Sequence, residues 1–223
     1  MSINPVLATF NWLVRSIAAI SLALAFAAGA WAQGLVEGTN YARIKNPQPV
    51  ESGKNIEVIE FFSYGCPHCG ELEPALQTWL KSKPADVTLR RVPVMFQPRW
   101  ESLAKVFYTL DAMGEEARMS PEVFSAIHGK GLVLSTDKTF FDWAESKGLD
   151  RKKVEDLFGS FAINGKVNRA KQQAQVYNIQ SVPTIIVDGK FVTGSERVTG
   201  GHAGVLAAID ALVVKARAER PKS

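Results

Sequence analysis

The chain of 223 residues is poor in cysteine and histidine, with two of the first and three of the second. Both cysteines, Cys66 and Cys69, lie in one stretch, FFSYGCPHC (residues 61–69). A small domain that depends on disulfides would carry several pairs, and closing so short a loop would stabilise the fold little. Zinc usually needs four ligands, and His128 and His202 lie in separate segments, which we interpret as solvated or capping histidines. The cysteines are therefore expected to be reactive, with no metal site.

Clusters of charge of one sign are also lacking. Lysine and arginine total 26 and aspartate and glutamate 22, which gives a formal charge of +4. The basic residues are scattered among the acidic ones, whereas a nucleic-acid-binding surface gathers them on one segment or face. The sequence shows no internal repeat and no low-complexity tract. We predict an ordinary globular protein with no nucleic-acid partner.

One long apolar run, IAAISLALAFAA (residues 17–28), lies near the N-terminus. It follows Arg15 and precedes Ala30-Trp31-Ala32. This order is typical of a secretory signal peptide, and the run is shorter than the ~20 residues of a membrane anchor, which is the alternative. We predict a signal peptide over residues 1–32 and an exported mature chain, in a compartment where disulfides persist.

The next segments predict an α/β arrangement. Residues 56–62 (IEVIEFF) are apolar on nearly both faces, which is typical of a buried central strand. Apolar residues recur at helical spacing over 67–81, and residues 87–94 (VTLRRVPV) form a second strand candidate. A short strand is expected near 41–44. Strand, helix and strand at this spacing predict a parallel pair of strands.

The pattern changes to helices alone over residues 97–178. We expect one helix to begin at Ser120-Pro121-Glu122, with serine as cap and proline in the first turn. Ser135 or Thr136 is expected to cap a second helix and Asp150 a third.

Strands return over residues 184–187 and 190–193, joined by the hairpin-forming pair Asp188-Gly189, and an amphipathic helix over 201–217 follows. We therefore predict an α/β domain split by a helical insertion. Its parts are residues 33–96 (first part), 97–178 (insertion) and 179–218 (second part). Residues 219–223 are expected to form a tail.

The chemistry of the cysteine pair follows from its place at the start of a helix. Pro67 suits the first helical turn, so Cys66 lies at the helix N-terminus, where backbone N–H groups and the helix dipole favour a thiolate. A protonated His68 would add to this effect, while Cys69, one turn further on, is expected to be more buried. A stabilised thiolate makes the bridge an unstable electron acceptor. We predict an oxidant that reacts through a mixed disulfide at Cys66.

The sequence leaves the interpretation of two further residues open. Glu60 lies in the predicted strand before the motif, either at an exposed edge or as a buried carboxylate that tunes a pKa or relays a proton. Either Arg90 or Arg91 on the next strand could pair with Glu60, since alternation allows only one. Pro183 stands at the start of a strand, where the trans isomer is the default for any X–Pro bond.

Two segments together resemble the DsbA family, the bacterial periplasmic thiol:disulfide oxidoreductases of the thioredoxin superfamily. They are VIEFFSYGCPHCGELEP (residues 58–74) and VPTIIVDGKFVTG (residues 182–194). A helical block separates them and a signal peptide precedes them, so the resemblance covers nearly all of the mature chain. The family is known for a low-pKa cysteine and a strongly oxidising disulfide.

The resemblance implies a thioredoxin-like fold with an inserted all-helical domain. It implies that the Val182–Pro183 bond is cis and faces the Cys66–Cys69 bridge, and that backbone groups of Val182 pair with an extended substrate segment. It also implies that Glu60 is a buried acid beneath the active site.

The resemblance further implies the partners and the compartment. The Cys66–Cys69 disulfide would be donated to unfolded, newly exported proteins in the periplasm, and no other cofactor is expected. A quinone-linked inner-membrane protein of the DsbB type would re-oxidise the pair, and the chain is expected to be a monomer. Gly70 and the pair Tyr64-Gly65 depart from the family pattern at the rim of the site, which bears on the groove and on the fit to the re-oxidant.

Two alternative functions differ from the oxidase. One is a reductase or isomerase of the same fold, although no spare length before the strand at Ile56 would hold the usual dimerisation domain. The other is a non-catalytic chaperone that binds peptide. Replacement of Cys66 by serine discriminates them, because only an enzyme would lose its activity.

Overall fold

The computed structural model describes residues 34–220, and the predicted signal peptide lies outside them. The chain divides into a short N-terminal unit, Met1–Leu35, and a compact unit, Val36–Ser223. Among the described residues, all strands and helices belong to the second unit. Within residues 34–220, no helix is both long and apolar enough to cross a membrane.

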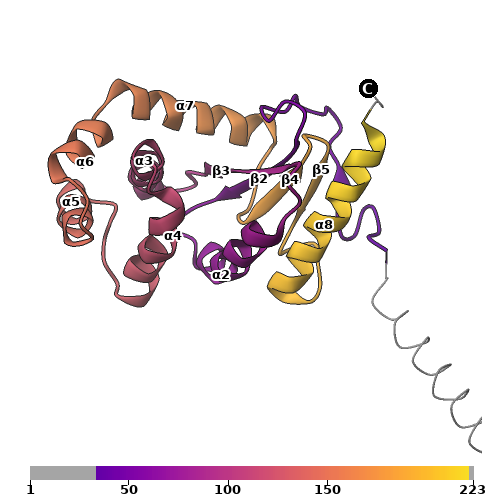
Figure 1. Ribbon diagram of the computed structural model, residues 1–223, viewed down its shortest axis with the longest axis horizontal. Helices are drawn as coiled ribbons and strands as arrows, with labels where there is room; N and C mark the ends of the chain where they lie inside the picture. Colours follow the sequence, from indigo (N-terminus) through magenta and orange to yellow (C-terminus); the bar gives the residue numbers. More distant parts are fainter. Residues whose placement is uncertain (1–33, 221–223) are drawn as a thin grey trace, which may run out of the picture. The chain divides into compact units, whose positions relative to one another are not determined.

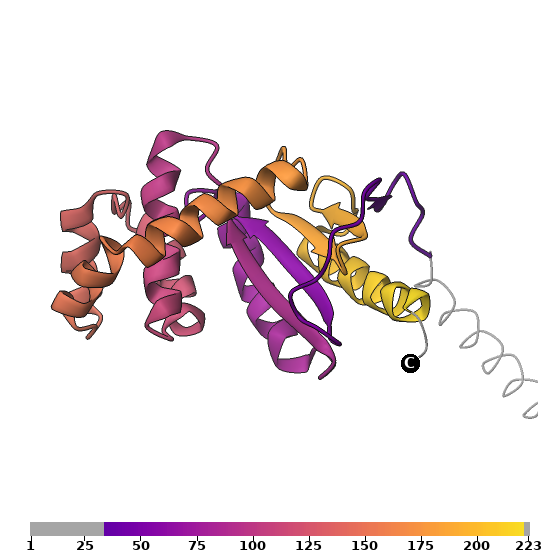
Figure 2. The same ribbon diagram turned by 90° about the horizontal axis from the view of Figure 1, so that it is seen from above.

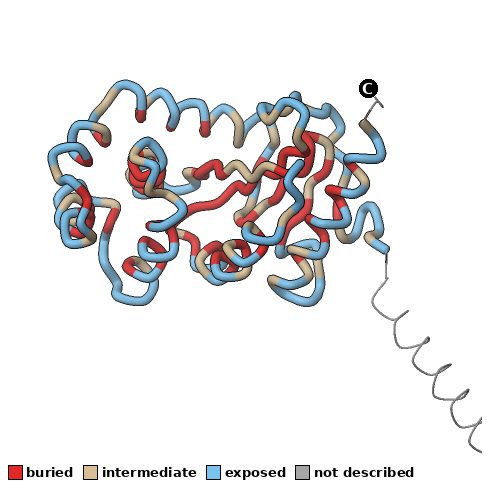
Figure 3. Tube along the Cα trace, viewed as in Figure 1, coloured by how far each residue is buried: buried red, intermediate tan, exposed pale blue. Residues whose placement is uncertain are grey.

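A five-stranded sheet forms the centre of this unit, with strand order β1-β5-β4-β2-β3 (Figure 1). The strands are β1 (Ala42–Arg43), β2 (Ile56–Phe62), β3 (Val87–Pro93), β4 (Thr184–Val187) and β5 (Phe191–Gly194). β2 and β3 are parallel, and β4 runs antiparallel to both β2 and β5. The predicted hairpin and parallel pair are therefore both present, and β2 lies inside the sheet between β4 and β3 and is buried along its whole length (Figure 3).

Helices cover the sheet and extend beyond its β3 edge (Figures 1 and 2). They are α2 (Pro67–Ser82), α3 (Pro98–Ala112), α4 (Glu116–Phe124), α5 (Asp137–Ser146), α6 (Arg151–Phe158), α7 (Phe161–Val176) and α8 (Gly201–Glu219). α2 and α8 pack together on one face, and α7 lies on the other. Helices α3 to α7 fill the predicted insertion, whose exact boundaries stay a prediction.

Aromatic side chains join the sheet to the inserted helices. Phe62 and Tyr64, at and just after the end of β2, pack edge-on against Phe107 of α3 and Phe124 of α4, with ring centroids 5.0 to 6.3 Å apart. All four side chains are buried. The end of β2, where the cysteine motif begins, is therefore fixed by a core that the helical insertion shares.

The predicted helix start at Ser120 is wrong. α4 begins at Glu116 and contains Pro121, and a π-helical turn, Ser125–Gly129, follows it directly. The Ser120 hydroxyl donates to the Glu116 carboxylate at 2.7 Å instead of capping a helix. Proline removes one helical N–H donor but does not end this helix, because the α4 side chains Met119 and Val123 are buried in the core.

The other predicted caps are mostly present. The Asp150 carboxylate accepts from the Lys153 N–H at the start of α6, as predicted. Thr136 is the residue before α5, although its side chain makes no capping bond there. Ser160 also caps a helix, because its side chain accepts from the Ile163 N–H at the start of α7.

Candidate active site

The turn after β2 places Cys66 at the start of α2. Cys66 is the cap residue in an extended conformation, and Pro67 is the first residue of the helix. Proline suits this position because its missing N–H would have no partner in the first turn. The Cys66 N–H donates to the Ser63 carbonyl at 3.0 Å, which closes a tight turn between strand and helix.

The two thiols have opposite acidities. The pKa of Cys66 is lowered to about 6, first by the hydrogen bond from the Cys69 thiol and then by the N–H groups of Cys69 and His68, against the effect of burial. The pKa of Cys69 is raised, because this thiol is buried and donates to Cys66. The predicted N–H groups contribute, but the largest cause is the partner thiol. Cys66 is therefore the thiol that ionises more readily, and Cys69 is its buried partner.

His68 lies on the exposed side of the helix start. Its side chain is 74% exposed, and its Nδ1 lies 3.2 Å from the Glu71 carboxylate. This contact raises the pKa of His68, so the ring is held more readily in its charged form. The charge of His68 lowers the pKa of Cys66, but it is the last of the contributions.

Val182 and Pro183 reach the cysteines from the other half of the sheet. β4 pairs antiparallel with β2, with Thr184 opposite Phe61, so the loop before β4 lies beside the end of β2. The Val182–Pro183 peptide bond is cis. The Cys66 thiol donates to the Val182 carbonyl at 3.5 Å, so these segments, 116 residues apart, meet at the reactive sulfur.

Glu60 is fully buried, which excludes the exposed edge. Arg91 donates from Nε to Glu60 at 2.7 Å, from Nη2 to Glu73 at 2.8 Å and from Nη1 to Glu116 at 3.0 Å. Burial raises the pKa of Glu60 to about 7 despite the opposing charge of Arg91. The charge of Glu60 in turn raises the pKa of Cys69. A carboxyl that titrates near neutral pH thus acts on the buried thiol.

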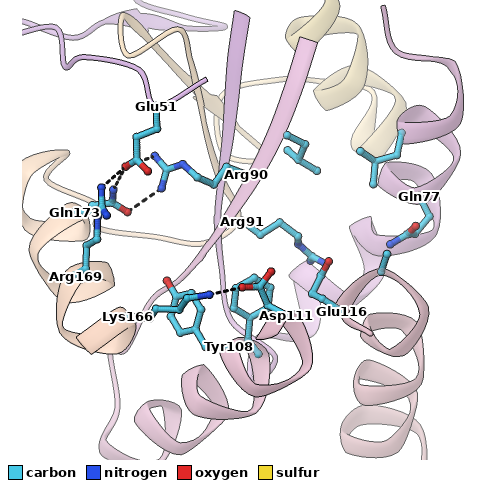
Figure 4. Close-up of a pocket in the computed structure, with 14 residues that line it drawn as sticks. Glu51, Gln77, Arg90, Arg91, Tyr108, Asp111, Glu116, Lys166, Arg169 and Gln173 are labelled. Atoms are coloured by element: carbon cyan, nitrogen blue, oxygen red, sulfur yellow. Dashed lines mark hydrogen bonds and ion pairs between the residues drawn. The ribbon is translucent and has the colours of Figure 1, made fainter. Parts of the chain in front are cut away.

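Arg90 points to the opposite side of β3, so Arg91 is the partner of Glu60. A cavity of about 510 Å³ lies against this strand, and both arginines line it (Figure 4). Arg91 and Glu116 reach it from one side, and Arg90, bound to Glu51 and Gln173, from the other. The buried charge cluster therefore borders a cavity whose lining does not include the cysteines.

The chain is similar to known proteins over most of its length. The model of the DSBA-like thioredoxin domain matches residues 57–201. The chain belongs to the DsbA-like thioredoxin family. The thiol:disulfide interchange protein DsbA of Bordetella parapertussis is 37% identical over 94% of this chain and 98% of its own length. DsbA of Pseudomonas aeruginosa strain PAO1 is 37% identical over 92% and 97%.

Solved DsbA structures share the fold. The Pseudomonas aeruginosa DsbA crystal structure has a TM-score of 0.79 and 37% identity, over 84% of this chain and 97% of that one. NmDsbA1 of Neisseria meningitidis has a TM-score of 0.75 and 30% identity, over 84% and 96%. The predicted thioredoxin-like fold with a helical insertion is confirmed, and the protein is a DsbA-type thiol:disulfide oxidoreductase. Among residues 34–220, no cluster of side chains suited to a metal ion is found.

The two glycines that depart from the family pattern have steric explanations. A Cβ on Gly65 would lie 2.3 Å from Nε1 of the Trp100 indole, which leaves no room for a side chain. A Cβ on Gly70 would lie 3.1 Å from the Phe124 ring, which is tight contact. Gly70 also lines an apolar pocket of about 430 Å³ between α2 and the α4 segment. The site rim is thus shaped by the insertion.

Sequence reasoning missed residues that the insertion brings to the site. His128 is exposed, as predicted for a solvated histidine, but its Nε2 lies 2.8 Å from the Tyr64 carbonyl. The Tyr64 hydroxyl lies 2.6 Å from Ser120 Oγ, and Glu73 and Glu116 complete the Arg91 cluster. Only Glu73, one helical turn beyond Cys69, could have been found by spacing. Glu116, Ser120 and His128 of the insertion are more than 45 residues away from the motif.

Proposed function

We propose that the protein oxidises pairs of thiols in exported proteins and that Cys66 is the residue through which substrates react. The observation that supports this most directly is the contrast in pKa, which is lowered at Cys66 and raised at Cys69. A stabilised Cys66 thiolate favours the reduced pair, so the bridged pair readily accepts electrons. The proposal also agrees with the DsbA-like family of the chain.

The reaction proceeds by two exchanges at sulfur. A substrate thiolate attacks Cys66 Sγ, the Cys66–Cys69 bond breaks, and a mixed disulfide forms while Cys69 leaves as a thiolate. A second substrate thiolate then attacks the substrate sulfur of the mixed disulfide and releases Cys66 as a thiolate. The substrate loses two electrons and two protons and gains a disulfide, and the protein becomes a dithiol.

Glu60 supplies the proton that Cys69 needs. With a pKa raised to about 7, the carboxyl is partly protonated near neutral pH, and the Cys69 thiolate takes a proton readily because burial disfavours its charge. His68 and the first N–H groups of α2 stabilise the Cys66 thiolate, which Pro67 places at the helix start. Each of these roles is part of the proposal.

Substrate binding uses the loop before β4. Val182 offers backbone groups beside Cys66, and an extended segment of an unfolded substrate would add to this edge as a further strand. Pro183 holds the loop in the conformation that turns the Val182 carbonyl toward the sulfur. Because main-chain bonds carry no side-chain preference, this mode suits a broad range of unfolded proteins.

The partners and the compartment complete the proposal. A signal peptide over residues 1–32 would deliver the chain to the periplasm, where disulfides persist. A quinone-linked inner-membrane protein of the DsbB type would accept the two electrons of the reduced pair and restore the bridge. The protein would act as a monomer, with no cofactor other than its own disulfide.

The redox equilibrium of the pair in defined glutathione buffers tests the proposal. Alkylation of free thiols followed by a gel shift measures the reduced fraction, and Cys69→Ser gives the control that cannot form the bridge. We expect the pair to stay reduced until the buffer is strongly oxidising. A pair that stays bridged in reducing buffer would favour the reductase or a structural role instead.

Replacement of Cys66 tests the chaperone alternative. Cys66→Ser should lose all turnover of a reduced, unfolded substrate. Cys69→Ser, after its Cys66 has been converted to a mixed disulfide with oxidised glutathione, should exchange glutathione for the substrate thiol and accumulate the mixed disulfide with the substrate. If the Cys66 variant still promoted refolding of a cysteine-free substrate as well as the parent, peptide binding would be the main activity.

A further inference from the structure

The two residues before Cys66 are held by the helical insertion. Ser63 to Cys66 form a turn outside both β2 and α2, so strand and helix bonds do not fix it. Side chains of α3, α4 and the π-helical turn instead contact Tyr64 and Gly65. Three separate elements of the insertion thus meet at one short turn.

The first contact is a buried chain of hydroxyl groups with a fixed direction. Ser120 has one hydroxyl hydrogen, which it donates to the Glu116 carboxylate at 2.7 Å. The Tyr64 hydroxyl must therefore donate to Ser120 Oγ, at 2.6 Å. Glu116 also accepts from Arg91, the residue that binds Glu60. The chain joins the turn before Cys66 to the charges beneath Cys69.

The second contact is made by His128. Its Nε2 lies 2.8 Å from the Tyr64 carbonyl, and because a carbonyl only accepts, Nε2 must carry a hydrogen. The ring stacks on Phe124, with an interplanar angle of 23°, and this fixes its direction. His128 lies in the π-helical turn Ser125–Gly129, a rare local structure that is frequent at functional sites. Tyr64 is thus held at its hydroxyl and at its carbonyl.

The third contact is the packing of Trp100 against Gly65, which further restricts the conformation of the turn. The Trp100 indole lies so close to Gly65 that a Cβ there would be 2.3 Å from Nε1. The Gly65 N–H donates to Ser63 Oγ at 3.1 Å, and the Cys66 N–H to the Ser63 carbonyl. Each residue of the turn is therefore bonded or packed before the chain reaches Cys66.

We propose that Tyr64, Ser120 and His128 are positioning residues, through which the helical insertion holds the Cys66 sulfur in place for thiol–disulfide exchange. The proposal rests on the proposed oxidase function. The N–H groups of α2 stabilise the Cys66 thiolate only if the sulfur stays within their reach. Loosening the turn should weaken this stabilisation, which makes the disulfide more stable and the protein a weaker oxidant.

Removal of the hydroxyl pair tests the first contact. Tyr64→Phe and Ser120→Ala should each shift the equilibrium constant with glutathione about fivefold toward the bridged form, the effect of one buried hydrogen bond. The pKa of Cys66, followed by the ultraviolet absorbance of its thiolate, should rise. The double variant should shift no further than Ser120→Ala alone, because that single variant already removes the bond between Tyr64 and Ser120.

Thr109→Val is the matched control. Thr109 has a buried hydroxyl in α3 without a hydrogen-bond partner among the described residues. Its removal should leave the Cys66 pKa and the glutathione equilibrium unchanged. If it shifts them as much as Tyr64→Phe does, or if Tyr64→Phe and Ser120→Ala lower stability to denaturant but move neither quantity, the positioning role is wrong.

Two variants of His128 test the second contact. His128→Leu removes the donor to the Tyr64 carbonyl and should shift the equilibrium in the same direction as Tyr64→Phe. His128→Gln keeps an N–H donor and should restore most of the parent value. Equal shifts for both variants would exclude the bond as the cause.

The parent protein separates this inference from the proposed function. The proposed function fails if the parent pair is bridged in reducing buffer. The inference fails if the variants do not differ from the parent, whatever the parent value is.

Discussion

Arg90 and Arg91 are neighbours on β3, yet they belong to two different charge clusters. Arg91 is buried and binds Glu60, Glu73 and Glu116 at 2.7 to 3.0 Å. Arg90 is a quarter exposed and binds Glu57 at 3.3 Å, with Glu51 at 3.6 Å. Alternation along the strand sends the two side chains to opposite faces, so the same residue type meets two environments.

The two clusters differ in how many donors and positive charges face their carboxylates. In the Arg91 cluster one guanidinium faces three carboxyl groups with little access to water, and ionising all of them is costly. Glu60 therefore has a pKa raised to about 7. Around Arg90, Gln173 and Arg169 add donors that bind Glu51. The first cluster holds a carboxyl group with a raised pKa, whereas the second ties the segment before β2 to α7.

The largest expected effect is on stability. Arg91→Met should lower the free energy of unfolding by about 3–5 kcal/mol, because it leaves buried carboxyl groups without their cation. Arg90→Met should cost only about 1–2 kcal/mol, since its cluster is more open and the Glu51 N–H still donates to Glu57. Chemical denaturation at neutral pH measures both. Equal losses would show that burial does not separate the two clusters.

The Arg91 variant also has an expected pH dependence. Without the guanidinium, the pKa of Glu60 should rise further, so the loss of stability should shrink as the pH falls and the carboxyls become neutral. A loss that is the same at pH 5 and pH 8 would contradict a charge-based cause.

The second prediction concerns Glu60 itself. Its folded-state pKa, raised from 4.5 to about 7, means that the folded protein binds more protons than the unfolded chain between these values. Stability should therefore fall as the pH rises through this window, by an amount on the order of 3 kcal/mol. Glu60→Gln should remove this component. Unfolding curves of parent and variant from pH 4 to pH 8 give the difference directly.

Glu60→Gln should also slow substrate oxidation, on the order of 10–100-fold, because the carboxyl no longer supplies a proton to Cys69. Glu57→Gln, the matched change on the other face, should leave the rate unchanged. Stopped-flow mixing of the oxidised protein with a dithiol measures both rates. A slow Glu57 variant would mean that the effect is general to the sheet.

The sequence predicts the fold well because its main signals are local. The buried strand at residues 56–62, the Asp188-Gly189 hairpin and the helical caps each follow from neighbouring residues. The choice between Arg90 and Arg91 does not, because the two arginines are adjacent in β3 and no local pattern shows which of them shares a face with Glu60. It depends on the register that places Glu60 opposite Arg91, which only the folded sheet sets.

The site was predictable only where it is close to the motif in sequence. The cysteines, His68 and Glu60 lie within ten residues of one another, and Pro183 came from the family resemblance. Ser120 looked like a helix cap because serine before proline usually is one, but its hydroxyl is bound by Tyr64 and Glu116. Tertiary contacts of this kind override local preference, and no local pattern marks them.

The smallest predicted effect concerns Glu116, one of the three carboxyl groups that bind Arg91. The charge of Glu116 raises the pKa of Glu60, so Glu116→Gln should lower that pKa while its side-chain oxygen still accepts from Ser120. The fall of stability with rising pH should then begin at a lower pH than in the parent. Glu116 is partly exposed, so the change should be below about 1 kcal/mol at any pH.

Glu51→Gln is the control for this change, because Glu51 binds Arg90 on the other face. Glu51→Gln should not change the pH dependence of stability that Glu60 produces. If both variants moved the pH dependence of stability equally, the two clusters would be coupled through β3. The two faces of β3 could then not be assigned separate roles, one in proton exchange and one in structure. If only Glu116→Gln moves the pH dependence, proton exchange beneath Cys69 depends on the three carboxyls that share Arg91.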